Sequence, residues 1–238
     1  MIIKEQDLLN FISCPIKYLI AKNGYDIKKK TYNSLLHKSF NYLLSTYLYC
    51  GINNLDTKIH KKWDIICVEN QDLISPKNVI EGWGKLYKGY EYLKYNNPNI
   101  IDLDIPYEIN IGNHTLTGQL NNIIDKGSQI EVLIPSFSNK MPESYIIDYD
   151  LKNTIDSLVI KTLYNKDTVF AYYNFTYNKI RYGLRTDKDY NRLKLIINNV
   201  ALAMEQNIIY PNSSYHCNSC LAKGLCNSWG LNDGLKNL

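Results

Sequence analysis

The chain has 238 residues, of which 45% are hydrophobic, and carries a formal net charge of +4. This composition excludes wholesale disorder, and the length allows one large domain or two small ones. No apolar run approaches the ~18–20 residues that cross a bilayer, and the acidic residues near the start do not fit a signal peptide. The mildly basic charge permits binding to nucleic acid without arguing for it.

The first part of the chain is predicted to be helical. Apolar residues recur at helical spacing in residues 7–23, 31–49 and 56–95, and Pro15 predicts a new turn within the first stretch. His37 lies among the apolar residues of the second stretch. The residues around 50–96 are therefore interpreted as a helical insertion, which ends at the loop signal of residues 96–99.

The second part alternates between strands and helices. We expect strands at residues 106–111, 115–124, 129–134, 168–177 and 180–184, and helices at 150–165 and 188–206. This order predicts one α/β domain covering residues 1–238. Residues 207–238 form a cysteine-bearing C-terminal segment within it.

Four cysteines are predicted to form a metal site. Three of them lie close together near the C-terminus: Cys217, Cys220 and Cys226. The fourth, Cys14, lies about 200 residues upstream. In a reducing compartment such clustered cysteines bind metal more often than they form disulfides, and their short spacings suit zinc as well as an iron–sulfur cluster. Cys50 and Cys67 have no close cysteine neighbour and are interpreted as small apolar residues.

Further segments point to a known group of nucleases. They are Cys14-Pro15-Ile16-Lys17-Tyr18, Leu36-His37, Leu116-Thr117-Gly118-Gln119-Leu120 and Ile209-Tyr210-Pro211-Asn212. With the cysteine layout, they resemble the RecB-like branch of the PD-(D/E)XK nucleases that carries an iron–sulfur cluster, including the AddB C-terminal nuclease and CRISPR-associated RecB-like exonucleases. The resemblance covers nearly the whole chain. It implies a mixed sheet flanked by helices, with an N-terminal helical region and a C-terminal cluster loop, and a [4Fe-4S] cluster bound by the four cysteines; zinc remains the alternative.

The same resemblance locates the catalytic positions. In the family a helix supplies a histidine, a Gly-x-x-Asp strand supplies a carboxylate, the next strand supplies an acid and a lysine, and the following helix supplies a glutamine and a tyrosine. The matching positions here are His37, Asn121, Ile134, Ser136, Lys152 and Asp156. Two acids and the lysine are thus replaced by asparagine, isoleucine and serine.

These replacements remove most of the groups that bind Mg²⁺ or Mn²⁺ and activate water. The sequence therefore favours a vestigial, non-catalytic centre over an active enzyme. One alternative is an active metal-dependent DNA exonuclease whose acids have moved to Glu108, Asp125 or Glu131. Another is a structural protein-interaction subunit of a replication, recombination or transcription assembly.

Basic and aromatic side chains are available for nucleic-acid contacts. We expect phosphate contacts from Lys28, Lys29, Lys30, Arg181 and Arg185, with a plain solvated surface as the alternative for each. Some of the 21 tyrosines are candidates for stacking on unpaired bases, although most tyrosines serve the core. DNA and other protein subunits are the expected partners, and a membrane is not.

Composition also bears on the source. Lysine, asparagine, isoleucine and tyrosine are abundant, which fits an AT-rich genome such as many phages carry. We therefore expect a phage or bacterial protein located in the cytoplasm (the host cytoplasm if a phage encodes it).

Overall fold

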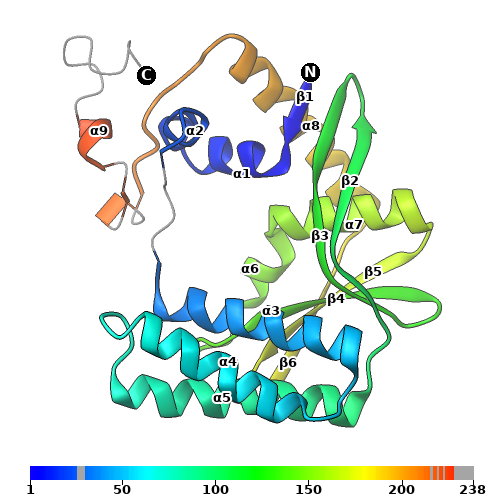
Figure 1. The fold of residues 1–238 in the computed structure, drawn as a ribbon. Coiled ribbons are helices and arrows are strands. Elements are labelled where there is room, and N and C mark those ends of the chain that lie inside the picture. Colours follow the sequence, from blue (N-terminus) through cyan, green and yellow to red (C-terminus); the bar gives the residue numbers. More distant parts are fainter. Residues whose placement is uncertain (26–29, 215–216, 219, 222, 228–238) are drawn as a thin grey trace. The chain divides into compact units, whose positions relative to one another are not determined.

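The computed structural model describes residues 1–25, 30–214, 217–218, 220–221 and 223–227. They belong to two compact units, whose elements are labelled in Figure 1. The first unit draws on Met1–Lys29, Pro106–Gly118 and Asp187–Leu238, and the second on Lys30–Ile105 and Gln119–Thr186. Within the described part of the chain, no helix is both long and apolar enough to span a membrane. The single domain expected over residues 1–238 stays a prediction.

The described elements confirm a mixed α/β fold. The strands are β1 (Ile2–Lys4), β2 (Ile100–Ile111), β3 (His114–Asp125), β4 (Gln129–Ser136), β5 (Asp167–Asn174) and β6 (Lys179–Leu184). The helices are α1 (Glu5–Ser13), α2 (Pro15–Lys22), α3 (Tyr32–Cys50), α4 (Leu55–Glu69), α5 (Pro76–Asn96), α6 (Ser144–Tyr149), α7 (Leu151–Tyr164), α8 (Asp187–Glu205) and α9 (Lys223–Asn227).

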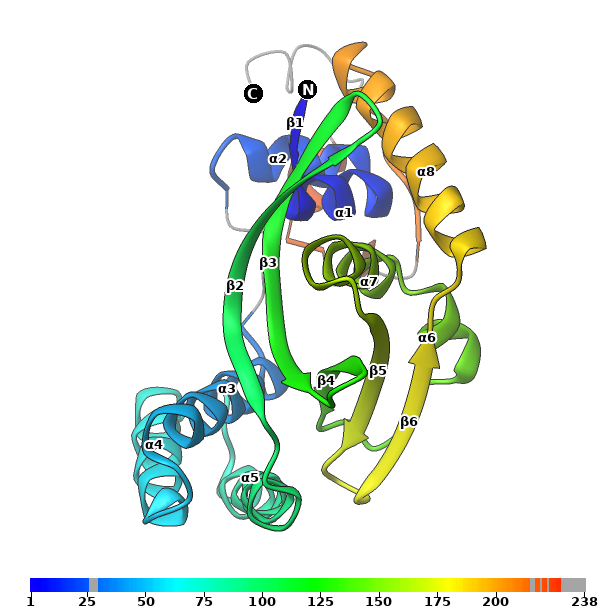
Figure 2. The ribbon, with the colours of Figure 1, turned by 90° about the vertical axis from the view of Figure 1, so that its right-hand side faces the viewer.

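The second unit is built on β4, β5 and β6, which lie side by side (Figure 2). β4 pairs with β5 in parallel, and α6 and α7 form the crossover between them. The second half of β3 is antiparallel to β4, and β6 is antiparallel to β5. β4 is buried along most of its length, as expected for a central strand covered on both faces.

Alternation along β4 decides which side chains face which helices. Leu133 lies opposite Ala171 and belongs to the core cluster formed with α3, α4 and α5. The next residue, Ile134, lies opposite Tyr172 and points to the other face, because successive strand side chains alternate. That other face is the one on which α7 packs, since Tyr172 contacts Asn153 of α7.

Helices α3, α4 and α5 confirm the helical character predicted for residues 31–95. Phe40 and Trp63 are fully buried between them, and each such ring contributes about 1.5–3 kcal/mol by burial. The Trp63 indole N–H donates to the Val79 carbonyl at 2.9 Å. Gly82 lets α5 approach closely, because a Cβ there would collide with the Trp63 ring.

In the first unit, Cys14 separates two short helices. Its backbone is extended (φ −168°, ψ 117°), and Pro15 begins α2 at the position where proline costs no hydrogen bond. The turn predicted at Pro15 is therefore confirmed. Phe11 and Tyr18 pack edge to face at 5.4 Å and contact Met204 of α8. β1 pairs in parallel with the start of β3.

Some boundaries differ from the sequence prediction. β1, α6 and α9 were not predicted, because such short elements leave little periodic signal. The strand predicted to reach residue 177 ends at Asn174. Its side-chain oxygen accepts hydrogen bonds from the backbone N–H groups of Thr176 and Tyr177, at 2.9 and 3.1 Å, and these turn the chain out of the sheet.

Candidate functional site

The positions matched to a nuclease centre lie in the second unit, around the C-terminal end of β4. Ile134 and Ser136 share the face that α7 covers, opposite Tyr172 and Asn174 of β5. Both are half-buried. The Ser136 hydroxyl lies 3.2 Å from that of Ser138. An isoleucine and a hydroxyl at these places provide neither a carboxylate nor a cationic side chain.

Asn121 is held by the neighbouring strand β2. Its amide, oriented by its hydrogen-bond network, donates to Oδ1 of Asp104 at 2.6 Å and to the Leu103 carbonyl at 3.2 Å. The following residue, Asn122, has a left-handed backbone (φ 54°), and its side chain donates to the Leu133 carbonyl at 3.4 Å. The amide of Asn121 therefore anchors β3 to β2 through the carboxylate of Asp104.

Helix α7 brings a charged pair to β3. The Lys152 ammonium lies 2.5 Å from Oδ1 of Asp156 and 3.2 Å from the carbonyl of Gln119, two residues before Asn121. Asp156 is buried. A buried carboxylate needs a compensating charge, and here an amine provides it. The structure thus brings together Lys152, Asp156 and the strand of Asn121, and a lysine cation neutralises the acid.

His37 lies near the same end of β4 but contacts an aromatic ring. Its imidazole packs edge to face on Phe137, the residue after Ser136, with 5.1 Å between ring centroids. Desolvation by the surrounding protein lowers the pKa of His37, although the residue reaches solvent. The neutral ring is therefore favoured at pH 7, a form that suits both a metal ligand and an aromatic packing partner.

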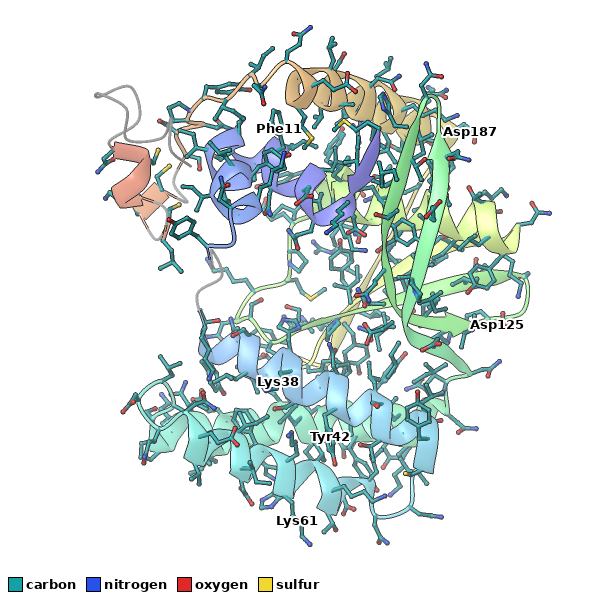
Figure 3. The ribbon with its side chains drawn as sticks, turned by 45° about the horizontal axis from the view of Figure 1, so that its top comes forward. Phe11, Lys38, Tyr42, Lys61, Asp125 and Asp187 are labelled. Atoms are coloured by element: carbon teal, nitrogen blue, oxygen red, sulfur yellow. The ribbon has the colours of Figure 1, made fainter. Side chains whose placement is uncertain are left out.

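Within the second unit, the two acids proposed as relocated catalytic groups do not converge. Asp125, labelled in Figure 3, accepts hydrogen bonds from Lys166 at 2.8 Å and from the Gly127 N–H at 2.9 Å. Hydrogen bonding to these donors lowers the pKa of Asp125. Glu131 lies opposite Ile124, on the face away from Ile134, with Lys126 Nζ at 3.7 Å.

Glu108, the third such acid, is an exposed residue of β2 in the first unit. Across the described residues, no group of three or more His, Cys, Asp or Glu side chains is arranged so that it could hold a metal ion.

The four predicted cysteine ligands are neighbours in the first unit. Cys14, Cys220 and Cys226 contact the buried pair Ile16 and Ile20. The pKa of the Cys226 thiol is raised by burial and then by the charges of Cys14, Cys217 and Cys220. The four thiols therefore lie in one neighbourhood, and their predicted role as metal ligands stays a prediction.

Backbone groups approach two of these sulfurs. The Asn212 N–H donates to Sγ of Cys14 at 3.4 Å, and the Ser214 N–H donates to Sγ of Cys217 at 3.3 Å. The Asn212 side chain also donates to the Ser13 carbonyl at 3.1 Å. Amide hydrogen bonds to sulfur stabilise thiolates, so the chemistry of these donors suits a metal, although the described side chains are not arranged as a formed metal site.

Comparison with known proteins bears on the fold. No protein-family model and no curated protein matches the sequence. The crystal structure of a "Putative exonuclease" from Eubacterium rectale is similar, with a TM-score of 0.60 and 11% identity over 91% of this chain and 86% of that chain. The chain has a nuclease-like fold. The crystal structure of SSO0001 has a TM-score of 0.35 and 13% identity over 89% of this chain and 93% of that one.

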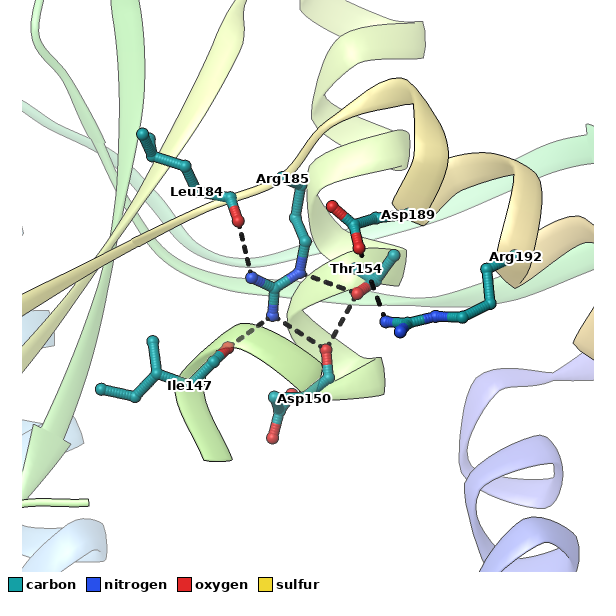
Figure 4. Close-up of polar contacts among 7 residues, drawn as sticks. All are labelled: Ile147, Asp150, Thr154, Leu184, Arg185, Asp189 and Arg192. Carbon is teal, nitrogen blue, oxygen red and sulfur yellow. Dashed lines mark hydrogen bonds and ion pairs between the residues drawn. The ribbon is translucent and has the colours of Figure 1, made fainter. Parts of the chain in front are cut away.

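Within the nuclease-like fold, Arg185 has an internal role (Figure 4). Its guanidinium donates to the Ile147 and Asp150 carbonyls at 2.8 and 3.0 Å, at the end of α6, and to Thr154 Oγ1 of α7 at 2.8 Å. The Ile147 carbonyl is one that the end of α6 leaves without an intrahelical partner, whereas the Asp150 carbonyl also accepts from the Thr154 N–H at 3.2 Å in the first turn of α7. The arginine therefore fastens α6 and α7 to the end of β6, and its predicted phosphate contact remains a prediction.

Of the other four predicted phosphate contacts, the structure describes two, Arg181 and Lys30. Arg181 is exposed and donates to the Pro142 carbonyl at 2.5 Å, which leaves other guanidinium N–H groups for further contacts. Lys30 is exposed at the start of the second unit. Lys28 and Lys29 lie outside the described residues.

Proposed function

We propose that this chain is a non-cleaving, nuclease-fold protein that binds DNA as an accessory subunit of a nucleic-acid-processing complex, of phage or bacterial origin. One observation carries the proposal: Lys152 neutralises the buried carboxylate of Asp156 beside the strand of Asn121. A metal-dependent nuclease needs carboxylates left open for a divalent cation. Here the acid on α7 is paired with an amine, and Ile134 and Ser136 offer no replacement.

An active exonuclease with relocated acids is the weaker alternative. Its two candidate acids in the second unit, Asp125 and Glu131, are each within ion-pair distance of a lysine. They lie on neighbouring strands, and their side chains point to opposite faces of the sheet. Paired residues share a face, and Glu131 pairs with Ile124 and not with Asp125. Two carboxylates must share one cation to activate water, and this arrangement separates them.

We also propose that Cys14, Cys217, Cys220 and Cys226 hold a [4Fe-4S] cluster, as in the RecB-like branch, with zinc as the alternative metal. Their proximity and the amide N–H groups directed at Cys14 and Cys217 support this. When bound, the metal group supplies a cross-link between the ends of the chain. Closing a loop of about 200 residues restricts the unfolded chain more than the folded one and so stabilises the fold.

A protein-interaction role is a second candidate function, favoured by β6. β6 is the edge strand of its sheet, and three side chains on one of its faces are exposed: Ile180 by 39%, Tyr182 by 57% and Leu184 by 64%. An edge strand with apolar side chains is a surface that a partner chain can cover. This role is compatible with nucleic-acid binding elsewhere on the chain.

The test is a binding and cleavage assay on anaerobically purified protein. Fluorescence anisotropy with single-stranded, duplex and forked DNA over a salt series, with Mn²⁺ present, measures binding, and a gel afterwards shows whether the DNA is intact. We expect salt-sensitive binding and intact DNA. Mn²⁺-dependent degradation would overturn the non-cleaving assignment, and no binding at low salt would leave the protein-interaction role.

A further inference from the structure

A row of aromatic rings follows one side of α5. The His60 ring of α4 meets Trp83 with 4.4 Å between centroids, Trp83 lies 5.8 Å from Tyr87, and Tyr87 lies 5.5 Å from Tyr90. The Lys94 ammonium completes the row, 5.9 Å from the centre of the Tyr90 ring. We call these five residues the aromatic row.

One side of the aromatic row packs against the hydrophobic core, and the other side is exposed to solvent. Trp83 and Tyr90 are half-buried and pack against the core of α3, α4 and α5. Tyr87 is 41% exposed, and Tyr95, whose ring lies 6.0 Å from the same Lys94 ammonium, is 76% exposed. Rings held by a core lose little further freedom when a ligand stacks on them, which favours binding.

The helical segment that carries the aromatic row has more basic than acidic residues, which suits an anionic ligand. Residues 30–96 contain nine lysines and six acidic residues. Two of the acids are already engaged, Asp64 with His60 at 3.2 Å and Glu81 with Lys77 at 3.6 Å. Elsewhere in the same helical segment, the Lys62 ammonium of α4 lies 5.5 Å from the ring of Tyr42 on α3, where Figure 3 labels Tyr42 and Lys61.

Exposed rings with interleaved ammonium groups match the chemistry of unpaired nucleic acid. Bases stack on aromatic faces whatever their sequence, and ammonium groups contact the phosphates between them. We infer that the aromatic row is a binding site for single-stranded DNA, with Tyr87 and Trp83 stacking on bases and Lys94 contacting a phosphate. This inference rests on the proposed DNA-binding function and assigns part of that binding to the helical segment.

The length of the aromatic row predicts how many nucleotides it can bind. Eleven residues separate Trp83 from Lys94 on one helix, a rise of about 16 Å at 1.5 Å per residue. A strand with stacked bases advances about 3.4 Å per nucleotide. The aromatic row therefore accommodates about five nucleotides, within the range found for other stacking sites.

The experiment compares two fluorescein-labelled probes of about 15 nucleotides, an oligothymidylate and a base-free strand with the same phosphates. Five proteins are titrated: wild type, Tyr87→Ala, Tyr87→Phe, Lys94→Ala and the control Tyr49→Ala. Tyr49 is 78% exposed on α3, outside the aromatic row, so the control removes a surface tyrosine without touching the site. Because Tyr87 and Tyr49 are both solvent-exposed, neither change is expected to prevent folding.

We expect Tyr87→Ala to weaken oligothymidylate binding roughly tenfold, with Tyr87→Phe and Tyr49→Ala close to wild type. The dependence on salt should stay unchanged in Tyr87→Ala, whereas Lys94→Ala should lower its slope by about 0.7. The base-free strand should bind weakly to every variant. If wild type binds oligothymidylate and Tyr87→Ala binds equally well, the inference is overturned and the proposed function stands. If wild type binds neither probe nor any other DNA, both fall.

Discussion

Lys152 and Asp156 form an ion pair one helical turn apart on α7, with 2.5 Å between Nζ and Oδ1. The Asp156 side chain is only 6% exposed, whereas that of Lys152 is 31% exposed. The ammonium also donates to the Gln119 carbonyl on β3. A positive charge is therefore built into this part of the nuclease-like fold, and the carboxylate beside it does not need a divalent cation for neutralisation.

Replacing Lys152 by methionine should destabilise the protein. The change leaves the carboxylate of Asp156 buried without its cation, and this costs about 1–3 kcal/mol after allowance for the partial exposure of the lysine. Adding Asp156→Asn should recover part of the loss, because a neutral amide depends less on the lost ammonium than a buried carboxylate does. Urea unfolding of the two single variants and the double variant measures this coupling. Strictly additive losses would show that the pair does not act as a unit.

Replacing Asn121 by aspartate should create a like-charge pair. The amide nitrogen of Asn121 lies 2.6 Å from Oδ1 of Asp104, so a second carboxylate would sit beside the first. Repulsion raises the pKa of one of the two carboxyls in the folded protein. A raised folded-state pKa favours the neutral form, so the variant loses stability as pH rises above about 4, by about 1 kcal/mol at pH 7.

Manganese provides the second readout for this variant. Mn²⁺ should raise the melting temperature of Asn121→Asp and leave that of wild type unchanged, because only the variant presents two adjacent carboxylates. Asn41→Asp is the control for an added negative charge, since Asn41 is exposed on α3. Equal Mn²⁺ responses in both variants would contradict the prediction.

The order of the longer helices and strands could be predicted because it depends on local periodicity, whereas the short β1, α6 and α9 could not. The contacts made at the candidate site could be predicted from the sequence only in part. The four-residue spacing of Lys152 and Asp156 suggests an ion pair, but the burial that makes it costly to break depends on tertiary packing. The contact of Asn121 with Asp104 depends on strand pairing that no local pattern reveals. Arg185 resembles a surface cation in the sequence, and only the fold shows it bound to the end of α6.

Gly118 should not tolerate a side chain. A Cβ at this position would lie 2.5 Å from Oη of Tyr107 and 2.6 Å from Oε2 of Glu5. These two groups form a buried hydrogen bond of 2.8 Å, so neither moves away without loss. Gly118→Ala should therefore cost about 1–3 kcal/mol in the free energy of unfolding.

Gly84 offers the matched control for that substitution. It lies within α5, and nothing is within 4 Å of a Cβ built there. Gly84→Ala should stabilise the helix by up to about 1 kcal/mol. Chemical denaturation of both variants gives the comparison, and a neutral Gly118→Ala would show that Tyr107 and Glu5 readily adjust.

His37 should make the stability depend on pH. Desolvation lowers its pKa in the folded state, so the unfolded chain binds this proton more tightly. The contribution is therefore fully present above the ordinary pKa of about 6.5 and is lost as pH falls toward the folded-state value. His37→Phe keeps an aromatic ring against Phe137 and removes the titration. Urea midpoints at pH 8 and pH 5.5 should differ less in this variant than in wild type; an equal difference would assign the pH dependence to other groups.

Loss of either end of the proposed metal cross-link should have the same effect. Cys14 and Cys217 approach from opposite ends of the chain, and loss of the metal on removal of either ligand would open a loop of about 200 residues. Cys14→Ala and Cys217→Ala should each lower metal content and cost about 4 kcal/mol, whereas Cys50→Ala, an exposed cysteine outside the group, should behave as wild type. Iron, sulfide and zinc analysis of anaerobic preparations distinguishes a brown [4Fe-4S] protein from a colourless zinc one. Normal metal content and melting temperature in Cys14→Ala would show that the two ends are not joined through metal.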